Sequence, residues 1–401
     1  MLTTYARNAI VLGLLSAIGP FAIDMYLPAL PTIAADLNAS TAATQMTLMA
    51  FFLAFGVCQI VYGPVSDMVG RKPPLYFGLA LFTLGAIGCS LATSIGWLIA
   101  FRVVQGVGGS AVMVIPRAII RDLHTGLEAA QLMSLMMLVL SVSPILAPLA
   151  GSALIVPFGW RAVFIAATVA AAVALVLLRL FLPETRLASD RIPVSVASLV
   201  GGFGQLLRSP RFLGLTFIGG LGMASFFTFL ASSSFIYINH FGLTPTQFSF
   251  AFSINAIGFI GASQFAAALG RRFGMARVVK TAVSIFAFFA VLDFAVFAAG
   301  ADSLKILIPL LFCGNAALGF VIPSAMVLAL DEHGPIAGMA SALGGTLQML
   351  TGGAAIALVS VFFNGTPLPM VAMIALCALG ALALSLVTLR GSMLARPMLA
   401  E

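Results

Sequence analysis

The chain has 401 residues, of which 61% are apolar and only 8% are charged, whereas about a quarter of the residues of an average soluble domain are charged. This composition excludes a soluble globular enzyme and indicates that lipid surrounds most of the protein. The formal charge of +7 is spread along the chain without a run of five basic residues, so it does not indicate a nucleic-acid partner.

Twelve long apolar segments recur from one end of the chain to the other. Each is long enough to cross a bilayer as an α-helix, which takes about 20 residues, and the short turns between them leave little room for a soluble domain. The first segment is too long for the apolar part of a signal peptide, so we treat it as a retained span. The predicted spans are 9–31, 42–62, 74–94, 97–120, 129–156, 160–182, 211–238, 246–269, 278–300, 303–330, 336–363 and 368–390.

The basic residues predict the orientation, because Lys and Arg accumulate in cytoplasmic loops. With a cytoplasmic N-terminus, 16 of the 19 basic residues lie inside, Arg161 and Lys305 lie outside, and Arg102 lies within a span. Both termini are therefore expected in the cytoplasm. The inside set is Arg7, Arg71, Lys72, Arg117, Arg121, Arg179, Arg186, Arg191, Arg208, Arg211, Arg271, Arg272, Arg277, Lys280, Arg390 and Arg396.

One long polar connection divides the spans into six and six. We therefore predict an all-α integral membrane protein with 12 transmembrane helices in two pseudo-symmetric six-helix bundles. The bundles occupy residues 1–182 and 211–401, and a cytoplasmic linker occupies residues 183–210. Transporters built from repeats have this layout and hold their substrate near the midplane between the repeats.

Three charged residues lie deep in the predicted spans, where a charge costs a few kcal/mol or more, so each is a functional candidate. Asp24 is about 9 Å below the outer end of span 1, and Arg102 is about 8 Å below the same face. We expect these two to pair, so that Asp24 can take up and lose a proton, which proton coupling requires. A static ion pair, or an Arg102 held by backbone carbonyls, is the alternative.

Two further features concern these deep charges. Pro20 and Pro28 lie four residues to either side of Asp24, and the helix donors they remove predict a bent or mobile span 1. Asp293 in span 9 is the third deep charge. Lys305 at the outer start of span 10 is expected to reach toward it, which favours a structural or interfacial role.

Uncharged polar and aromatic residues within the spans are the candidates for substrate contact. Any one polar side chain is more often a link between helices than a ligand contact. A Phe- and Met-rich cavity suits varied apolar ligands, because such surfaces repack, and Asp293 as the only deep charge of the second half argues against a strongly anionic ligand. The candidates are Tyr26, Gln45, Gln59, Gln105, Asn255, Gln264, Asn315 and Gln348, with Phe226 and Phe227 among the aromatic residues.

Several kinds of site have no support in the sequence. The four cysteines are each isolated in an apolar segment, and the three histidines lie in or beside different loops, so we expect no metal site, no disulfide framework and no catalytic residues. None of the three lysines ends a phosphate-binding loop pattern, so we expect no nucleotide cofactor. The glycines of span 4, such as Gly106 and Gly108, predict close helix contacts instead.

The loop between spans 2 and 3 carries a motif that resembles the signature of the major facilitator superfamily, G-x-x-x-D-x-x-G-R-[RK]. The match is complete and reads Gly63-Pro-Val-Ser-Asp67-Met-Val-Gly70-Arg71-Lys72. Three motifs, Asp24-Met-Tyr26-Leu-Pro28, Arg102-Val-Val-Gln105-Gly106 and Arg117-Ala-Ile-Ile-Arg121-Asp122, together with Pro183-Glu184-Thr185, resemble the bicyclomycin and chloramphenicol resistance branch of drug:proton antiporters. This resemblance covers all twelve spans.

The resemblance implies roles for several of these residues. Asp67 and Arg71 would form an inner gate, with Asp67 facing the N-terminal end of span 11 near Ile336 and paired with Arg121. Asp24 would be the protonation site and Arg102 the partner that senses its charge. Drug and proton would then compete for one cavity in a bacterial cytoplasmic membrane protein, which we expect to be a monomer in lipid.

Span 5 departs from the antiporter pattern. The glycine-rich run G-P-x-x-G-G is replaced by Pro144-Ile-Leu-Ala-Pro148-Leu-Ala-Gly151-Ser152, in which only the second proline and Gly151 match. This leaves the direction of transport less defined than the fold. Met136 and Leu140, one turn apart on span 5, are predicted to line the cavity.

Three functions compete on this evidence. The leading one is proton-driven efflux of small, apolar, neutral or cationic drugs, with phenicols as candidates. The alternative is a proton-coupled exporter or symporter of a specific metabolite, such as a sugar or amino-acid derivative. An integral-membrane enzyme or receptor would need a catalytic constellation or an extramembrane domain, and the sequence indicates neither.

Overall fold

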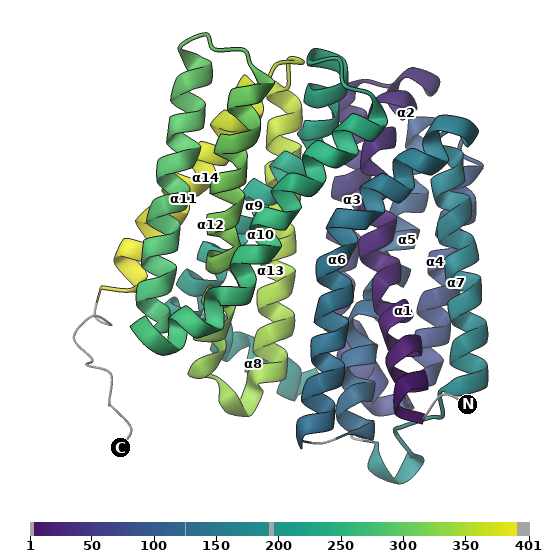
Figure 1. Ribbon diagram of the computed structural model, residues 1–401. Coiled ribbons are helices and arrows are strands. Elements are labelled where there is room, and N and C mark those ends of the chain that lie inside the picture. Colours follow the sequence, from purple (N-terminus) through teal and green to yellow (C-terminus); the bar gives the residue numbers. More distant parts are fainter. Residues whose placement is uncertain (1–3, 125, 192–195, 391–401) are drawn as a thin grey trace. The chain divides into compact units, whose positions relative to one another are not determined.

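The computed structural model describes residues 4–124, 126–191 and 196–390, and in these ranges the chain is helical with no β-strand (Figure 1). Within the described ranges, twelve helices are long and apolar enough to cross a membrane, and they coincide with the twelve predicted spans. Arg396, one of the basic residues used to predict orientation, lies outside the described residues.

The helices form two compact units, each described here by itself. Unit 1 comprises Met1–Val196 and Thr244–Phe250, and unit 2 comprises Ala197–Leu243 and Ala251–Glu401. The helices that lie wholly in unit 1 are α1 (Thr4–Asp24), α2 (Leu30–Asp36), α3 (Thr41–Val69), α4 (Lys72–Ser90), α5 (Ile95–Leu123), α6 (Gly126–Phe158), α7 (Arg161–Phe181) and the short 3-10 helices η1 (Leu27–Ala29) and η2 (Ala188–Asp190), while the first residues of α10, up to Phe250, also belong to unit 1. Those of unit 2, apart from α8, are α9 (Pro210–Ser234), the π-helix η3 (Phe235–His240), α10 (Pro245–Phe273), α11 (Met275–Ala298), α12 (Leu304–Asp331), η4 (Gly334–Ile336), α13 (Ala337–Phe362) and α14 (Leu368–Thr388).

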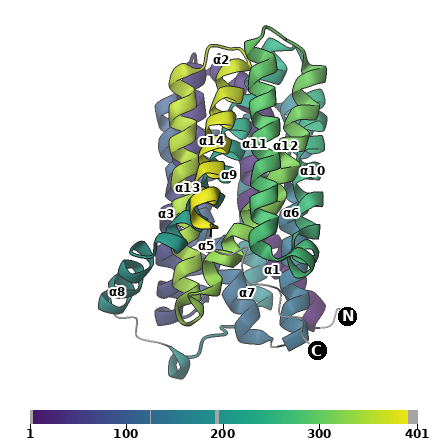
Figure 2. The ribbon, with the colours of Figure 1, turned by 90° about the vertical axis from the view of Figure 1, so that its left-hand side faces the viewer.

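The segment between the sixth and seventh spans contains more structure than a polar connection. Helix α8 (Val196–Leu207) occupies its second part, where the sequence analysis expected only a linker. Figure 2 shows α8 as a separate short helix beside the lower end of α13, and the Met339 side chain on α13 covers Gly202. A helix of 12 residues is too short to cross the membrane, which explains why the search for spans missed it.

In unit 1, α5 packs against α3 and α4, while α1 packs against α5, α6 and α7. The close crossing of α4 and α5 depends on Gly108, because a Cβ atom there would overlap the Gly78 carbonyl oxygen and the Phe82 amide nitrogen. This confirms the predicted role of the span 4 glycines as close-approach positions. The apolar core beside this crossing includes Leu15, Leu79, Ile115, Met136 and Leu178.

In unit 2, α9 is the central helix and packs against α12, α13 and α14, while α11 packs against α12 and α14. Aromatic residues fill much of the space around α9. Phe229 stacks on Phe252 with their ring centroids 5.4 Å apart, and Phe227 packs against Gly352 on α13. The glycine lets the ring approach the α13 backbone, so Phe227 holds these two helices together.

We expect Gly108→Ala to lower the thermal unfolding midpoint of the purified protein in detergent. The added methyl group overlaps backbone atoms that cannot rotate away, and overpacking of this kind costs about 1–3 kcal/mol. Gly96→Ala is the matched control on the same helix, because a Cβ atom there meets nothing closer than the Ser94 hydroxyl at 4.0 Å. Equal midpoints for the two variants would contradict the role given to Gly108.

Candidate functional site

The turn between α3 and α4 holds a buried arginine in a network of acidic groups. Gly70 has a φ of +101°, which turns the chain so that Arg71, 4% exposed, points back into unit 1. Its Nη1 is 2.7 Å from Asp67 Oδ1 and donates to Ser66 Oγ at 2.8 Å. Its Nε and Nη2 donate to the two carboxylate oxygens of Asp122 at 2.7 and 3.2 Å. We call Ser66, Asp67, Arg71 and Asp122 the Arg71 cluster.

Glu184, in the segment after α7, caps the start of α4. Its carboxylate accepts hydrogen bonds from the backbone N–H groups of Arg71 at 2.8 Å and of Lys72, Thr185 and Arg186 at 3.0 Å each. Partial burial opposes ionisation, but these four donors prevail and lower the pKa of Glu184. A carboxylate at a helix N-terminus is also favoured by the helix dipole, so Glu184 ties the connecting segment to the predicted gating turn.

The remaining residues of the predicted gate occupy the same region. Gly63 lies on α3, and its carbonyl oxygen accepts from the Ser66 hydroxyl at 2.8 Å. Lys72 donates through Nζ to the Leu182 carbonyl at 2.7 Å. Both contacts hold the end of α3 and the start of α4 in place around the turn.

The predicted pairing of Asp67 with Arg121 is wrong. Arg121 is exposed, and its Nε reaches the Arg117 carbonyl on its own helix at 3.4 Å, whereas Arg71 binds Asp67 and Asp122. Asp122 and Glu184 stand in two of the sequence motifs, but neither was among the residues predicted to form the gate. The available signal was Arg71 itself, because a guanidinium that becomes buried needs compensating partners, and carboxylates are the strongest of these.

Asp24 is the last residue of α1, and the regular helix stops there. The chain continues through η1 and then α2 (Figure 1), so the predicted bend of span 1 is confirmed, and Pro28, which has no N–H to donate, lies within η1. On α6, Gly151 leaves room for this break, because a Cβ atom there would overlap the Met25 carbonyl oxygen. Gly151 is one of the two span 5 positions that match the antiporter pattern.

The Asp24 carboxyl is 6% exposed. The Ser143 hydroxyl on α6 interacts with it electrostatically, without a hydrogen bond of standard geometry. Among the residues that the structure describes, no basic nitrogen lies within 4.0 Å of this carboxylate. The acid at the helix break is therefore enclosed but not neutralised by a cation.

The predicted ion pair between Asp24 and Arg102 is absent. The Arg102 guanidinium lies over the rings of Tyr26 and Phe51, with Cζ 4.7 and 4.3 Å from their centroids. Its Nη1 donates to Gln105 Oε1 at 2.7 Å and to the Ala22 carbonyl at 3.4 Å. Aromatic faces attract a cation, so Arg102 is held without a carboxylate, although its contact with Ala22 confirms the matching depth of the two residues.

Tyr26 and Gln105 are fully buried around this arginine. The Tyr26 hydroxyl forms a 2.7 Å hydrogen bond with the Thr47 hydroxyl on α3. Within the described chain, Gln105 Nε2 has no hydrogen-bond partner, and neither do Nε and Nη2 of Arg102. Three buried donors beside one another are unsatisfied, which is a costly arrangement unless another group binds them.

The other predicted substrate residues divide into polar contacts and packing residues. Asn315 donates to Asn255 Oδ1 at 3.2 Å across α10 and α12, so these two predictions fall together in unit 2. Gln348 on α13 is 8% exposed, and its Nε2 is unpartnered in the described structure. Phe226 is partly exposed and stacks on Phe259 at 5.5 Å.

Two of the predicted cavity residues are placed differently from expectation. Met136 is 2% exposed and belongs to the apolar core of unit 1, and Phe227 is enclosed against α13. Leu140, one turn after Met136, is partly exposed. When both sides of a helix are apolar, the spacing of its apolar residues does not show which side faces the core. For this reason the sequence predicted Met136 to line the cavity, although it lies in the core.

The predicted contact between Lys305 and Asp293 is also absent. Lys305 is exposed at the start of α12, and the described residues include no basic group within 4.0 Å of Asp293. Asp293 on α11 is 2% exposed, and neither of its carboxyl oxygens has a hydrogen-bond partner in the described chain.

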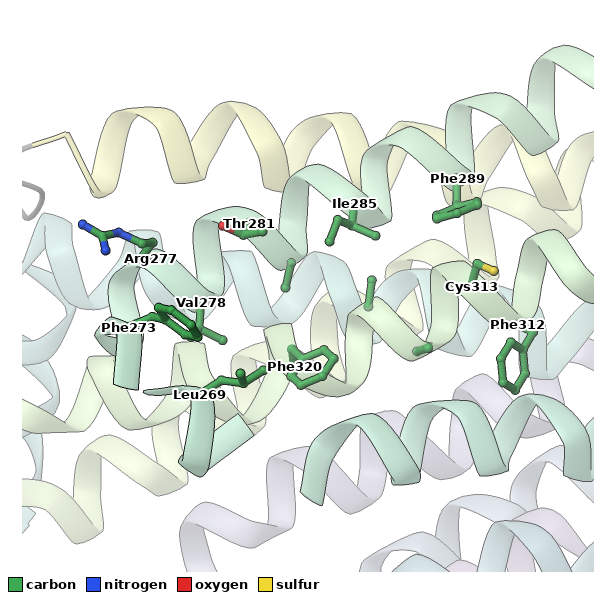
Figure 3. Close-up of a pocket in the computed structure, with 13 residues that line it drawn as sticks. Leu269, Phe273, Arg277, Val278, Thr281, Ile285, Phe289, Phe312, Cys313 and Phe320 are labelled. Atoms are coloured by element: carbon green, nitrogen blue, oxygen red, sulfur yellow. The ribbon is translucent and has the colours of Figure 1, made fainter. Parts of the chain in front are cut away.

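An apolar groove of about 560 Å³ lies in unit 2 between α10, α11 and α12 (Figure 3). Figure 3 shows Arg277 at one end of it and Phe289 and Phe312 at the other. None of the predicted substrate residues lines this groove. The described residues also contain no cluster of three potential metal ligands.

Twelve membrane-length helices, with charged residues buried inside two helical units, define a polytopic membrane protein. The chain belongs to the Major Facilitator Superfamily, which it matches over residues 12–356. It is 35% identical over 346 residues to the MFS-type transporter YdgK of Bacillus subtilis (strain 168), with 86% of each chain covered. It is 31% identical over 276 residues to the bicyclomycin resistance protein homolog of Haemophilus influenzae, with 69% of each chain covered.

The fold also resembles solved structures of transporters. A bacterial homolog of the human lysosomal transporter Spinster, in an inward-facing and unoccupied conformation, aligns with a TM-score of 0.74 at 15% identity over 97% of this chain and 98% of that one. At this identity the likeness shows the fold alone. The family membership establishes a membrane transporter, not an enzyme, that crosses the cytoplasmic membrane many times.

We expect Asp122→Asn to lower the thermal midpoint of the protein, because removing one partner of a buried ion pair costs about 3–5 kcal/mol. Arg121→Gln is the control on the adjacent residue, whose side chain is exposed, and it should change the midpoint little. Thermal unfolding of both variants in detergent is the measurement. If Arg121→Gln lowered the thermal midpoint more than Asp122→Asn did, Arg121 and not Asp122 would be the residue whose charge stabilises this turn.

The capping contact predicts a pH dependence. Because the pKa of Glu184 is lowered in the folded protein, its contribution to stability is complete above the unfolded pKa of about 4.3 and is lost as the pH falls through the lowered value. The difference in midpoint between the wild type and Glu184→Gln should therefore be full at neutral pH and shrink in acid. A difference that stays constant across this range would exclude the carboxylate as its source.

Proposed function

We propose that this transporter exports small, apolar, neutral or cationic drugs in exchange for protons by alternating access. The similarity to the bicyclomycin resistance protein homolog supports a drug as the substrate. The observation that carries the proton-coupled part is Asp24, a buried carboxyl group without a cation partner at a break in a membrane helix.

The helix break gives Asp24 its proposed role. A carboxylate that is buried without a cation is costly, whereas the protonated carboxyl is much less so. When Asp24 becomes accessible to water, its O–H bond breaks and the proton passes to a water molecule; when it is enclosed again, the carboxylate takes a proton back. The irregular backbone from Asp24 to η1 provides a position at which such a change of access needs little rearrangement of the rest of α1.

Arg102 acts on this exchange through its charge and not through a direct bond. Its contact with the Ala22 carbonyl places the guanidinium two residues before Asp24 along α1. A cation at this distance favours the carboxylate, and low surrounding polarity strengthens the effect. A bound drug with a hydrogen-bond acceptor would find the unsatisfied donors of Arg102 and Gln105, so drug binding and proton loss would favour one another.

The Arg71 cluster supplies the gating element. Asp122, with a side chain 13% exposed, holds the guanidinium, while Asp67 is 39% exposed. Asp67 can therefore leave Arg71 and bind the N-terminal end of span 11 without leaving a bare buried charge, since Asp122 remains in place. This exchange of partners would accompany the change between the inward-open and outward-open states.

Within unit 2, the amide groups of Asn255, Asn315 and Gln348 would contact polar groups of the drug, and Phe226 would contact its apolar part. Phenicols combine an aromatic ring with amide and hydroxyl groups, so they match this set. The distribution of basic residues supports a cytoplasmic position for both termini.

The test is proton release from purified protein on addition of a panel of drugs that includes a phenicol. We expect the wild type to acidify a weakly buffered solution and Asp24→Asn to bind drug with a release reduced at least twofold. Asp36→Asn is the control in the same predicted region, because the Asp36 carboxylate is half exposed and paired with Arg161 at 2.8 Å. Undiminished release from Asp24→Asn would remove Asp24 from the coupling step, and drug binding without release from the wild type would refute antiport.

A further inference from the structure

Asp293 on α11 is a membrane carboxyl group that the exchange at Asp24 does not use. It lies five residues before the end of the helix at Ala298, about 8 Å along the axis. Its side chain is enclosed, and in the described chain both carboxyl oxygens lack a hydrogen-bond partner. An ionised carboxylate in such surroundings would be among the most costly groups of the protein.

Among the described residues, no basic nitrogen lies within 4.0 Å of Asp293, and His240, the basic residue of η3, binds Asp302 at 2.8 Å instead. Helix α11 packs on α12 and α14. The titratable residues of α12 are Lys305, which is exposed at its start, Cys313 and Asp331, and α14 carries only Cys377. On α11 itself, Arg277 and Lys280 are at the opposite end, at least about 20 Å away along the axis.

The Tyr237 side chain is close enough to Asp293 for the two groups to interact electrostatically. Tyr237 is fully buried in the π-helix η3, which continues α9. A π-helical turn is rare and is found frequently at functional sites. In this protein the π-helix η3 takes the place of the last regular turn of α9, beside the enclosed Asp293 side chain.

Unit 1 also combines an irregular helix end with a buried tyrosine and a buried charged residue, but there the charge is positive. The first long helix of each unit loses its regular geometry near its C-terminal end, and the irregular segment holds a fully buried tyrosine, Tyr26 or Tyr237. Beside Tyr26 is Arg102, and beside Tyr237 is Asp293. Ring faces carry a partial negative charge, so they can hold the Arg102 cation but cannot neutralise an anion.

We propose that Asp293 is a second proton-exchange site, carried by unit 2. In the enclosed state it holds a proton, since no other group neutralises it. When movement of α11 or η3 admits water, the carboxyl O–H bond breaks and the proton passes to water, and enclosure of the carboxylate takes up a proton again. The coupling of this proton exchange to drug export rests on the proposed function. The protonation of Asp293 does not depend on it.

Labelling with dicyclohexylcarbodiimide tests the protonation directly. This reagent adds to a protonated carboxyl group in apolar surroundings and leaves a stable acylurea, which mass spectrometry locates in the peptide. In the full-length protein in detergent we expect Asp293 to be labelled, with a yield that falls at least several-fold from mildly acidic to mildly alkaline pH. Asp302, exposed in the same unit and bound to His240 at 2.8 Å, is the control and should stay unlabelled.

Two labelling results would overturn the proposal. Equal labelling of Asp293 at every pH would mean that its proton is never exchanged, and absence of labelling at acidic pH would mean that the enclosed group is not a protonated carboxyl. The same labelling in Asp24→Asn separates this site from the first one. Asp293 could remain labelled in Asp24→Asn while the wild type releases no protons on drug binding. This pair of results would reject the proposed function but retain Asp293 as a protonation site.

Proton release provides the functional readout. Asp293→Asn mimics the protonated carboxyl and should fold with an unchanged thermal midpoint, but the protons released for each drug molecule bound should fall to about half of the wild-type number. Asp293→Glu should restore release. Wild-type release from Asp293→Asn would show that the group takes no part in exchange with drug, and would overturn its place in the transport cycle.

Discussion

A charged group enclosed among membrane helices must find its partner inside the protein, because the hydrocarbon supplies none. The protein meets this constraint in three ways. Arg71 binds two carboxylates and a hydroxyl group, Arg102 lies on two aromatic rings, and Asp24 and Asp293 have no basic nitrogen within 4.0 Å among the described residues. In the first arrangement every nitrogen of the guanidinium has a partner, whereas the last two leave polar atoms that a water molecule or a ligand could still bind.

The irregular helix ends follow from the same constraint. A continuous α-helix satisfies its own backbone and offers little to a neighbouring side chain, but a broken one exposes carbonyl groups and redirects side chains. The end of α1 supplies the Ala22 carbonyl and the Tyr26 ring to Arg102, and the π-helix after α9 brings Tyr237 to Asp293. Each break occurs in a helix that is otherwise well packed, so the change of geometry stays local.

The sequence was sufficient to predict the twelve spans, the bend at Pro28, the close approach at Gly108 and the turn around Arg71, because hydropathy, proline and glycine act locally. Side-chain partners were harder to predict. Arg121 and Asp122 are adjacent in sequence, but neighbouring positions on a helix point about 100° apart, and only Asp122 faces Arg71. The sequence also contained 33 phenylalanines, and nothing in their spacing marked Phe51 as the residue that would replace a carboxylate beside Arg102.

The contact of Glu184 with four backbone N–H groups also has a mechanical consequence. The segment that leaves α7 is fastened to the first turn of α4, and Thr185 donates to Asp122 at 3.1 Å, so the chain that connects the two units is attached directly to the residues around Arg71. A pulling force on the chain that follows Thr185 would act on the turn between α3 and α4 before it acted on α7. The segment after α7 is thus anchored at the same turn that the Arg71 cluster stabilises, so a force on this segment acts first on the start of α4.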